Sequence, residues 1–342
     1  MKILLVGGSS RALGGVERYC ERFAEAFRPV PGVVVESASA DTAVAGAPLP
    51  AYARGLAGSF AAVGRAAARL DTRTDAVWLQ YGNAPDLALL AWLRARFRGR
   101  LLVTAHAGEQ WRHLRSPGPR RAAAWALRRA DRVCALSEAQ RTMWAGMGIA
   151  AEVVPTLLPA WINEPVDTAA ERSGILFVGR LSPEKGIPDL LEAFSALPGD
   201  ELLHVAGAAE PAYLQFLRDQ AAGLGVRDRV RWYGPLGERQ VLVLMRACRV
   251  LAYPSYADAY PLSLLEGVAA GMRVVAYGIP GTLEILRESG GAAVPLGDRA
   301  ALAAVLAREA AAPPADPSHA LRLRERLGWD AVVRTYLAIA RA

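Results

Sequence analysis

Short apolar runs alternate with amphipathic segments along the whole chain, a pattern typical of parallel α/β sheets. In the N-terminal half the apolar runs predict strands at Lys2–Val6, Val33–Val35, Ala76–Leu79, Arg100–Thr104, Arg132–Leu136 and Glu152–Val154. In the C-terminal half they predict strands at Ile175–Val178, Glu201–Ala206, Val230–Tyr233, Val250–Tyr253, Arg273–Ala276 and Ala292–Val294. Amphipathic segments such as Val16–Phe27, Asp189–Leu197 and Arg239–Arg249 predict helices between them. The pattern therefore predicts two consecutive α/β halves.

The chain has 342 residues, which fits two domains better than one. Residues 164–173 are polar and have no hydrophobic period, so we take them as the linker. We expect a Rossmann-like N-terminal domain over residues 1–165 and a second over 166–325. Residues 326–342 would form a C-terminal helix, with Trp329 and Tyr336, that packs back on the N-terminal domain.

The composition is that of a globular protein, with 53% hydrophobic and 21% charged residues. No apolar run approaches the roughly 18 residues of a membrane span, and Met1 begins directly on a predicted strand without a signal peptide, so we expect a cytoplasmic protein. The three cysteines, Cys20, Cys134 and Cys248, are scattered. They predict buried free thiols rather than a disulfide framework or a metal site.

The formal charge of +7 lies in the first half of the chain. Residues 1–165 hold 21 Arg or Lys against 13 Asp or Glu, and the remainder holds 19 against 20. The basic residues concentrate in Arg94–Arg100 and Arg112–Arg132. Three interpretations stay open: a solvated basic face, a surface for an anionic acceptor or for the anionic inner face of a membrane, and, least favoured, nucleic-acid binding.

The glycine-rich turn Gly7–Gly15 follows the first strand and imitates a dinucleotide-binding motif. Glu36, after the second predicted strand, lies where a ribose-binding acid would be in such a fold. A short-chain dehydrogenase, however, needs a tyrosine with a lysine four residues later. The two lysines of the chain, Lys2 and Lys185, are not so placed, and we set this function aside.

Two stretches of the C-terminal half carry the candidate chemistry. In Tyr256–Gly271 the carboxylates Asp258 and Glu266 are eight positions apart, and Pro261–Ala270, which contains Glu266, reads as a short helix. The N-terminus of that helix suits a phosphate, and Glu266 could accept hydrogen bonds from hydroxyl groups. Upstream, Ile175–Gly186 places two cations just after a strand. Together the stretches indicate a site for a diphosphate that carries a sugar.

Several motifs in this order, GGVER, VTAHAG, VGRLSPEKG and PSYADAYPLSLLEGVAAG, followed by a tryptophan-bearing last helix, resemble family 4 of the retaining glycosyltransferases. The match extends over essentially the whole chain. The resemblance implies the GT-B fold, an α/β architecture in which two Rossmann-like domains with parallel sheets face each other across a cleft. The second domain would hold most of the nucleotide sugar.

The resemblance also assigns roles to residues of the second domain. Arg180 and Lys185 would bind the donor diphosphate and stabilise the charge that builds on the leaving phosphate. Backbone N–H groups at the helix start would add to this cradle, Glu266 would bind the ribose, and backbone groups after the third strand would contact the base. The residues implied in these backbone contacts are Leu262, Ser263, Gly234 and Leu236.

In the first domain, the Gly15 N–H would approach the donor phosphate, and His106 would lie beside the reacting sugar. Residues on loops after two strands would face the acceptor: Tyr81, Asn83, Glu109, Gln110 and Trp111. Asp258 departs from the family pattern, which has glutamate there in contact with the sugar. Aspartate shortens the reach by one methylene, so we expect an altered fit for the sugar.

The implied reaction is transfer with retention by front-side attack, without a protein nucleophile. Cations already neutralise the phosphates and no Asp-x-Asp pair is present, so we expect no metal and no other cofactor. UDP is the expected nucleotide of the donor, and GDP and ADP stay open. The acceptor would be a glycan, glycolipid or natural product. Two alternatives remain: a sugar-nucleotide epimerase of the same fold, and a non-catalytic sugar-nucleotide-binding protein.

Overall fold

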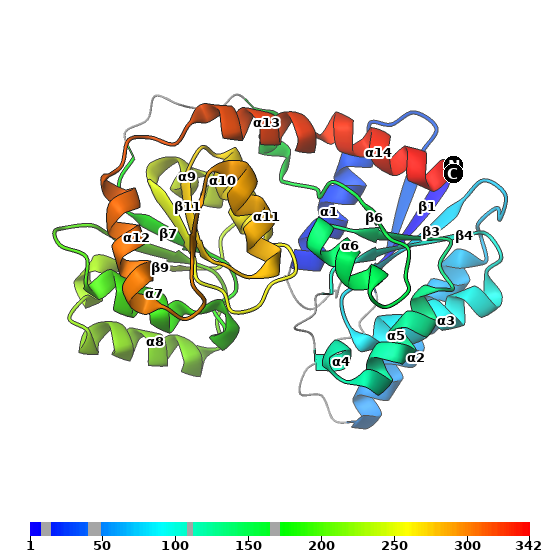
Figure 1. Ribbon diagram of the computed structural model, residues 1–342. Coiled ribbons are helices and arrows are strands. Elements are labelled where there is room, and N and C mark those ends of the chain that lie inside the picture. The colour runs from blue at the N-terminus through cyan, green and yellow to red at the C-terminus, as the bar shows by residue number, and fades with distance from the viewer. Residues whose placement is uncertain (8–14, 40–48, 108–111, 165–171) are drawn as a thin grey trace. The chain divides into compact units, whose positions relative to one another are not determined.

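The computed structural model describes residues 1–7, 15–39, 49–107, 112–164 and 172–342. They form two compact units, one of Met1–Ala160 with Leu327–Ala342 and one of Trp161–Arg326 (Figure 1). The domain boundary predicted at residue 165, and most of the predicted linker, lie outside the described residues. Each unit contains a parallel sheet with helices around it, which confirms the predicted α/β fold class.

In the first unit, six parallel strands have the order β2-β1-β3-β4-β5-β6 over the described residues. Their bounds are β1 Lys2–Val6, β2 Val34–Ala38, β3 Ala76–Tyr81, β4 Arg100–Ala105, β5 Arg132–Ala135 and β6 Glu152–Val153. The helices of this unit are α1 Gly15–Phe27, α2 Leu49–Ala67, α3 Ala84–Arg96, α4 Arg112–Arg115, α5 Pro117–Leu127, α6 Glu138–Ala145 and α14 Trp329–Arg341. Glu36 lies inside β2 rather than after it, which removes the analogy to a ribose-binding acid.

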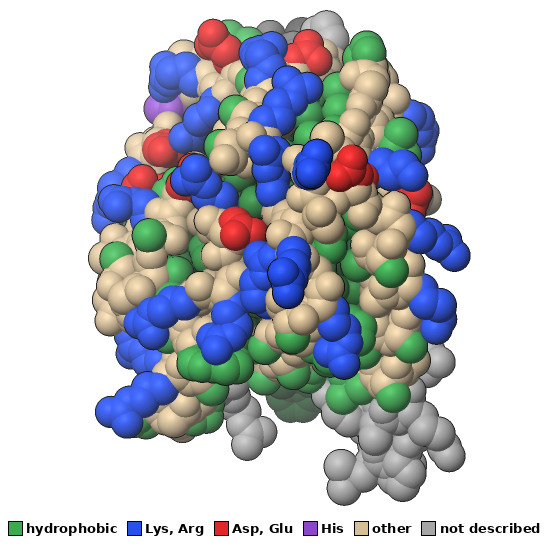
Figure 2. All heavy atoms as spheres, turned by 90° about the vertical axis from the view of Figure 1, so that its right-hand side faces the viewer, with side chains coloured by type: hydrophobic (Ala, Val, Ile, Leu, Met, Phe, Trp, Pro, Cys, Tyr) green, Lys and Arg blue, Asp and Glu red, His purple; other side chains and the backbone are tan. Residues whose placement is uncertain are grey.

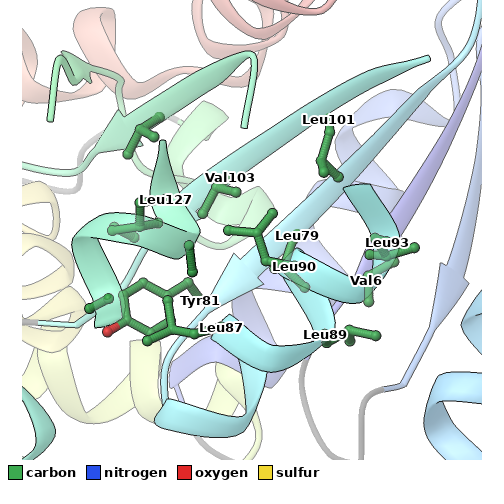
Figure 3. Close-up of a cluster of buried hydrophobic side chains, with 14 of the residues drawn as sticks. Val6, Leu79, Tyr81, Leu87, Leu89, Leu90, Leu93, Leu101, Val103 and Leu127 are labelled. Carbon is green, nitrogen blue, oxygen red and sulfur yellow. The ribbon is translucent and has the colours of Figure 1, made fainter. Parts of the chain in front are cut away.

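The central strands of this sheet are buried on both faces, as parallel strands covered by helices must be. Every residue of β3 is buried, and so are five of the six residues of β4. Figure 3 shows Val103 of β4 and Leu79 of β3 near Leu90 of α3, and Val6 of β1 near Leu93 of the same helix, within one hydrophobic core. Continuous apolar strands therefore explain why the sequence pattern located this sheet.

The last helix, α14, packs on the first unit through aromatic side chains. The Tyr336 ring lies 4.9 Å from that of Trp78 and 5.4 Å from that of Phe23. Its hydroxyl donates to the Pro155 carbonyl at 2.9 Å and contacts the Tyr19 hydroxyl. The core of this unit thus contains residues from both ends of the described chain.

In the second unit, six parallel strands have the order β12-β11-β10-β7-β8-β9 over the described residues. Their bounds are β7 Ile175–Val178, β8 Leu203–Ala206, β9 Val230–Gly234, β10 Val250–Tyr253, β11 Arg273–Tyr277 and β12 Ala292–Val294. The helices are α7 Ile187–Ser195, α8 Pro211–Gly223, α9 Glu238–Ala247, α10 Leu262–Ala269, α11 Pro280–Ser289, α12 Arg299–Ala311 and α13 Pro317–Leu327, with short 3-10 turns η1 Ala160–Asn163, η2 Pro183–Lys185 and η3 Arg227–Arg229. The three cysteines are buried free thiols, as predicted.

Part of the excess positive charge of the first unit serves its own structure. Arg94 forms an ion pair with Asp131 at 3.0 Å and also donates to the Phe97 carbonyl at 2.6 Å. Arg100 donates to the Ala340 carbonyl of α14 at 2.7 Å. Figure 2, drawn from the side of this unit, shows basic side chains across the whole face, with acidic ones among them in its upper part and hydrophobic ones among them in its lower part.

Candidate active site

The strand order of the second sheet reverses between β7 and β10. From β7 the chain continues through β8 and β9 towards one edge, then crosses back to β10, β11 and β12. Ligands of open α/β sheets bind at such a reversal, beyond the carboxyl ends of the two strands. The segments that follow β7 and β10 are the two stretches that the sequence singled out.

A tight turn after β7 carries Arg180 and Lys185. The turn η2 ends at Gly186, which has a left-handed φ of 65°. A Cβ at this glycine would lie 1.9 Å from the carbonyl oxygen of Pro254, so a side chain would collide with the segment after β10. Glycine is therefore required both by conformation and by packing, and it allows the two segments to touch.

The segment between β10 and α10, residues 254–261, is called the carboxylate loop here because it contains Asp258. The Tyr256 N–H donates to the Glu184 carbonyl at 2.8 Å, which joins the loop to the turn after β7. From the other side, the carbonyl oxygen of Asp258 lies 2.4 Å from where a Cβ of Gly281 would be. The loop is thus held between two backbone segments that both need glycine for the close approach.

Lys185 and Asp258 bind each other, and Tyr253 at the end of β10 joins them. Lys185 Nζ lies 2.6 Å from Asp258 Oδ2 and 2.8 Å from the Tyr253 hydroxyl. That hydroxyl donates to the same carboxylate oxygen at 2.6 Å, and the Tyr260 N–H donates to Oδ1 at 3.2 Å. The side chains of Lys185 and Asp258 are 13% and 19% exposed, so solvent screens their attraction only partly.

Arg180 projects from the same turn, with its side chain 70% exposed and 3.5 Å from the Glu184 carboxylate. Burial alone would raise the pKa of Glu184, but the hydrogen bond from Ser182 and the nearby Arg180 and Lys185 charges hold it below its usual value. Each cation predicted to bind phosphate therefore has a carboxylate beside it. A diphosphate at this position would compete with those carboxylates.

Helix α10 starts directly after the carboxylate loop. Pro261 is its extended N-cap residue, so the predicted first helical position was one residue early. Leu262 and Ser263 are the first two helical residues, and N–H groups there have no partner within a helix. Glu266 follows one turn later and is 7% exposed, which distinguishes it from a solvated surface carboxylate. The helix ends before Gly271, whose φ is 78°.

Gly234 and Leu236, the residues predicted to contact the base, lie at the carboxyl end of β9. Gly234 has a φ of 69°, and its carbonyl accepts the Gly207 N–H at 2.8 Å. A Cβ at Gly207 would meet the Gly179 carbonyl oxygen at 1.7 Å. The segments that follow β7, β8 and β9 are therefore in backbone contact along this edge of the sheet.

In the first unit, Gly15 is the first residue of α1. A Cβ there would meet no described atom within 4 Å, while the preceding residues 8–14 lie outside the description. The described part of the protein therefore does not itself require glycine at this position. The predicted approach of its N–H to a phosphate remains a proposal.

His106 follows β4 and is partly buried. Its Nε2 lies 2.9 Å from Gln80 Oε1, and its ring meets the Tyr19 ring edge-on at 4.8 Å. Burial lowers the pKa of His106 to about 4, so the imidazole is neutral near pH 7. It can bind a hydroxyl but supplies no positive charge.

The predicted acceptor-facing residues have different positions. Tyr81 is 0% exposed and packs in the core 6.1 Å from Trp144, so the expectation that it faces an acceptor is wrong (Figure 3). Asn83 precedes α3, and its N–H donates to the Asp86 carboxylate at 2.9 Å, a helix-start role. The other three predictions, Glu109, Gln110 and Trp111, lie outside the described residues.

Sequence reasoning missed three residues that shape this site. Tyr253 was noted only as the end of an apolar strand, although a tyrosine hydroxyl that is buried usually has a polar partner. Gly281 follows the proline that opens α11, where a glycine after Pro280 could have indicated close backbone packing. Gly186 was read as the end of a motif without its steric reason.

Among the described residues, no three side chains of His, Cys, Asp or Glu lie together in a way that could hold a metal ion. No helix in the same part of the chain is both long and apolar enough to cross a membrane.

Curated relatives share part of the chain. A D-inositol 3-phosphate glycosyltransferase from Streptomyces coelicolor is 34% identical over 178 residues, which are 47% of this chain and 38% of the relative. A protein of the same name from Mycobacteroides abscessus is 37% identical over 118 residues, 33% of this chain and 26% of the relative. The chain thus spans less than half the length of these relatives.

Solved structures share the fold over the whole chain. A sucrose-phosphate synthase from Thermosynechococcus elongatus has a TM-score of 0.80 at 20% identity and covers 100% of this chain and 98% of its own. HepE from Anabaena in complex with UDP-glucose has a TM-score of 0.76 at 19% identity and covers 99% of both chains. These similarities identify the two sheets as a two-domain, Rossmann-like GT-B fold.

Family models match both units. Residues 13–158 match the model described as Glycosyltransferase Family 4, and residues 163–316 match the one described as Glycosyl transferases group 1. The two matched ranges lie end to end and meet near the division between the units. Together the two matches show that the chain belongs to glycosyltransferase family 4.

Proposed function

We propose that this protein is a retaining glycosyltransferase that moves a sugar from a UDP-sugar to an acceptor hydroxyl. One observation carries the proposal. The reversal of the second sheet brings together a lysine, a carboxylate and the start of a helix, which suit a phosphate, a sugar hydroxyl and a second phosphate oxygen. Family membership supplies the reaction class.

In the proposed complex, Lys185 and Arg180 bind the diphosphate, together with the N–H groups of Leu262 and Ser263. Charge develops on the leaving phosphate as the glycosidic bond breaks, so donors fixed at this point lower the barrier. Glu266 binds the ribose hydroxyls. Asp258 binds hydroxyls of the transferred sugar.

Backbone groups at Gly234 and Leu236 would contact the base, because a backbone at the end of β9 can meet the edge of a pyrimidine without a specific side chain. HepE, one of the structural neighbours, is bound to UDP-glucose, which supports UDP as the nucleotide of the donor. From the first unit, the Gly15 N–H would meet the phosphate and the neutral His106 would meet the sugar.

The proposed attack comes from the same face as the leaving group. The acceptor oxygen bonds to the anomeric carbon while the bond to the phosphate oxygen breaks, and the departing phosphate takes the proton of the acceptor hydroxyl. This path needs no protein nucleophile. Lys185 and Arg180 provide the positive charge at the phosphates that a metal would otherwise supply.

The acceptor is proposed to be an anionic glycan, glycolipid or natural product. The net positive charge of the first half of the chain supports an anionic group, and the curated relatives are named for D-inositol 3-phosphate, a phosphorylated polyol. A direct test adds that compound to the transfer assay and compares it with unphosphorylated inositol.

The site assignment is tested by binding and transfer. We expect one of UDP-glucose, UDP-galactose, UDP-N-acetylglucosamine, GDP-mannose and ADP-glucose to raise the melting temperature of the wild type, and EDTA to leave the transfer rate unchanged. Lys185→Ala and Glu266→Gln should abolish transfer while the protein remains folded, which circular dichroism checks. Matched controls are Lys2→Ala, at the other lysine, and Glu325→Ala, an exposed glutamate of α13.

Wild-type turnover in both site variants would contradict the assignment. The two alternatives give different products from the donor alone. An epimerase converts the nucleotide sugar without any acceptor, whereas a transferase gives at most slow hydrolysis. A non-catalytic binding protein would show a rise in melting temperature with the nucleotide sugar but no transfer and no hydrolysis. Any transfer or hydrolysis that Lys185→Ala abolishes would therefore exclude this alternative.

A further inference from the structure

The two charged residues at the centre of the site have separate tasks in the proposed function, yet they bind each other. Lys185 would hold the diphosphate and Asp258 the sugar, while Nζ and Oδ2 are 2.6 Å apart. When Lys185 binds a diphosphate instead, Asp258 loses one of the hydrogen-bond donors that fix its carboxylate. The orientation of the Asp258 carboxylate towards a sugar then depends on its remaining hydrogen-bond donors.

Tyr253 is the side chain that can hold it. The hydroxyl donates to Asp258 Oδ2 at 2.6 Å while it accepts from Lys185 at 2.8 Å. Its ring is 2% exposed and stacks on Phe177 of β7 with an interplanar angle of 8°. The hydroxyl is therefore fixed by two neighbouring strands, independently of the lysine.

The phenol acts as a donor and not as a base. Burial raises the pKa of Tyr253 well above its usual value, and the negative charge of Asp258 raises it further. The O–H group therefore stays protonated across the working pH range. Its hydrogen bond to the carboxylate persists when Lys185 turns to another anion.

We propose that Tyr253 is a positioning residue for sugar recognition: it keeps Asp258 directed at the sugar when Lys185 exchanges its carboxylate partner for the diphosphate. This inference rests on the proposed function. With the Tyr260 N–H on Oδ1, the Tyr253 hydroxyl leaves the short carboxylate little freedom to follow a sugar that does not fit. The pair would therefore set which sugar hydroxyls are accepted.

A matched control lies on the neighbouring strand. Tyr277 of β11 is also fully buried, and its hydroxyl also donates to a carboxylate, Asp189 Oδ2, at 2.8 Å. Asp189 additionally pairs with Arg299 at 2.8 Å and accepts a hydrogen bond from the Tyr256 hydroxyl of the carboxylate loop at 2.5 Å. Tyr277→Phe removes a comparable hydrogen bond but leaves the Tyr256 hydroxyl bonded to Asp189 and the Tyr253 hydroxyl bonded to Asp258.

The experiment measures two dissociation constants, one for the nucleotide sugar from the panel above that the wild type binds and one for the nucleoside diphosphate with the same base. In Tyr253→Phe we expect affinity for the nucleotide sugar to fall at least about tenfold, the loss that corresponds to a hydrogen bond with a charged group. Affinity for that nucleoside diphosphate, which lacks the sugar, should stay unchanged. In Tyr277→Phe the ratio of the two constants should equal that of the wild type, even if the melting temperature falls.

An unchanged ratio in Tyr253→Phe would overturn the inference, whether both affinities fall together or neither does. A double-mutant comparison tests the route through the carboxylate. In an Asp258→Ala background, Tyr253→Phe should have no further effect on the ratio, and an additive effect would also overturn the inference. If the wild type binds none of the panel, the proposed function itself fails and Tyr253 has no sugar to position.

Discussion

The two cationic side chains of the site each lie beside a carboxylate that neutralises their charge, and the candidate histidine of the first unit is uncharged. Lys185 has Asp258 beside it, Arg180 has Glu184, and His106 has no charge at all near pH 7. With Glu266 also in the site, an anionic ligand therefore meets no excess of positive charge there. Directed N–H groups and the exchange of carboxylate partners, rather than a strong positive field, would provide the affinity for it.

His106 makes the stability of the protein sensitive to acid. Its folded pKa of about 4 lies below the value near 6.5 of an unfolded chain, so between these values only the unfolded state binds the proton. Stability should fall as the pH drops from about 6.5 towards 4 and should not depend on this residue above about pH 7. The melting temperature of the wild type should drop more between about pH 7.5 and about pH 5 than that of His106→Asn.

The control is His319→Asn, since His319 is on α13 and exposed to 27%. That variant should keep the full pH dependence of the wild type. If His106→Asn and the wild type lose equal stability in acid, the imidazole is not the group responsible.

Among the elements, the carboxylate loop depends on the start of α11. A Cβ at Gly281 would lie 2.4 Å from the Asp258 carbonyl oxygen. The atoms nearest to it belong to the backbone of the carboxylate loop, which cannot move aside as a flexible side chain could. We expect Gly281→Ala to displace the loop, to weaken nucleotide-sugar binding and to destabilise the protein by about 1–3 kcal/mol, the usual cost of overpacking. Titration calorimetry and urea unfolding measure the two effects.

Gly223→Ala is the matched control, because a Cβ at the end of α8 meets nothing within 4 Å. It should leave binding unchanged and should be neutral or stabilising by up to about 1 kcal/mol. A Gly281→Ala protein that binds as the wild type does would show that the loop position is not critical.

Among the described residues, the sequence located the central strands of both sheets most clearly, because parallel strands covered on both faces are almost continuously apolar. It placed the end of β2 too early, since β2 is an edge strand and its Glu36 and Ser37 are exposed. The segments of the proposed site were also predicted, through residue types with distinct chemistry. Tyr81 was misjudged and Tyr253 was missed. The sequence of a strand that ends in tyrosine is the same whether the tyrosine hydroxyl enters the core or the site.

At the scale of the whole molecule, the basic character of the first half supports a proposal of weak contact with anionic membranes. Arg94 and Arg100 are used internally, but Arg98 and Arg121 are exposed. We expect the protein to cosediment with phosphatidylglycerol vesicles at low ionic strength and to be released by salt. Arg98→Glu with Arg121→Glu should reduce this binding, whereas Arg227→Glu, an exposed arginine of the second unit, should not.

Absence of binding at low ionic strength would contradict the proposed membrane contact. The basic residues would then support only an anionic acceptor that is dissolved in water. Binding that survives high salt would contradict the electrostatic explanation, because exposed charges are screened over about 10 Å or less at such ionic strength.

The return of the chain to the first unit at Leu327 determines the order in which the protein can be completed on the ribosome. Phe23 and Trp78 emerge early, but the Tyr336 ring that covers them is made only after the entire second unit. An aromatic surface therefore waits uncovered while some 250 residues are translated, at a rate of about 5–20 residues per second. The unit that begins to fold first is the last to be finished, and chaperones that bind exposed aromatic surfaces would have their longest opportunity there.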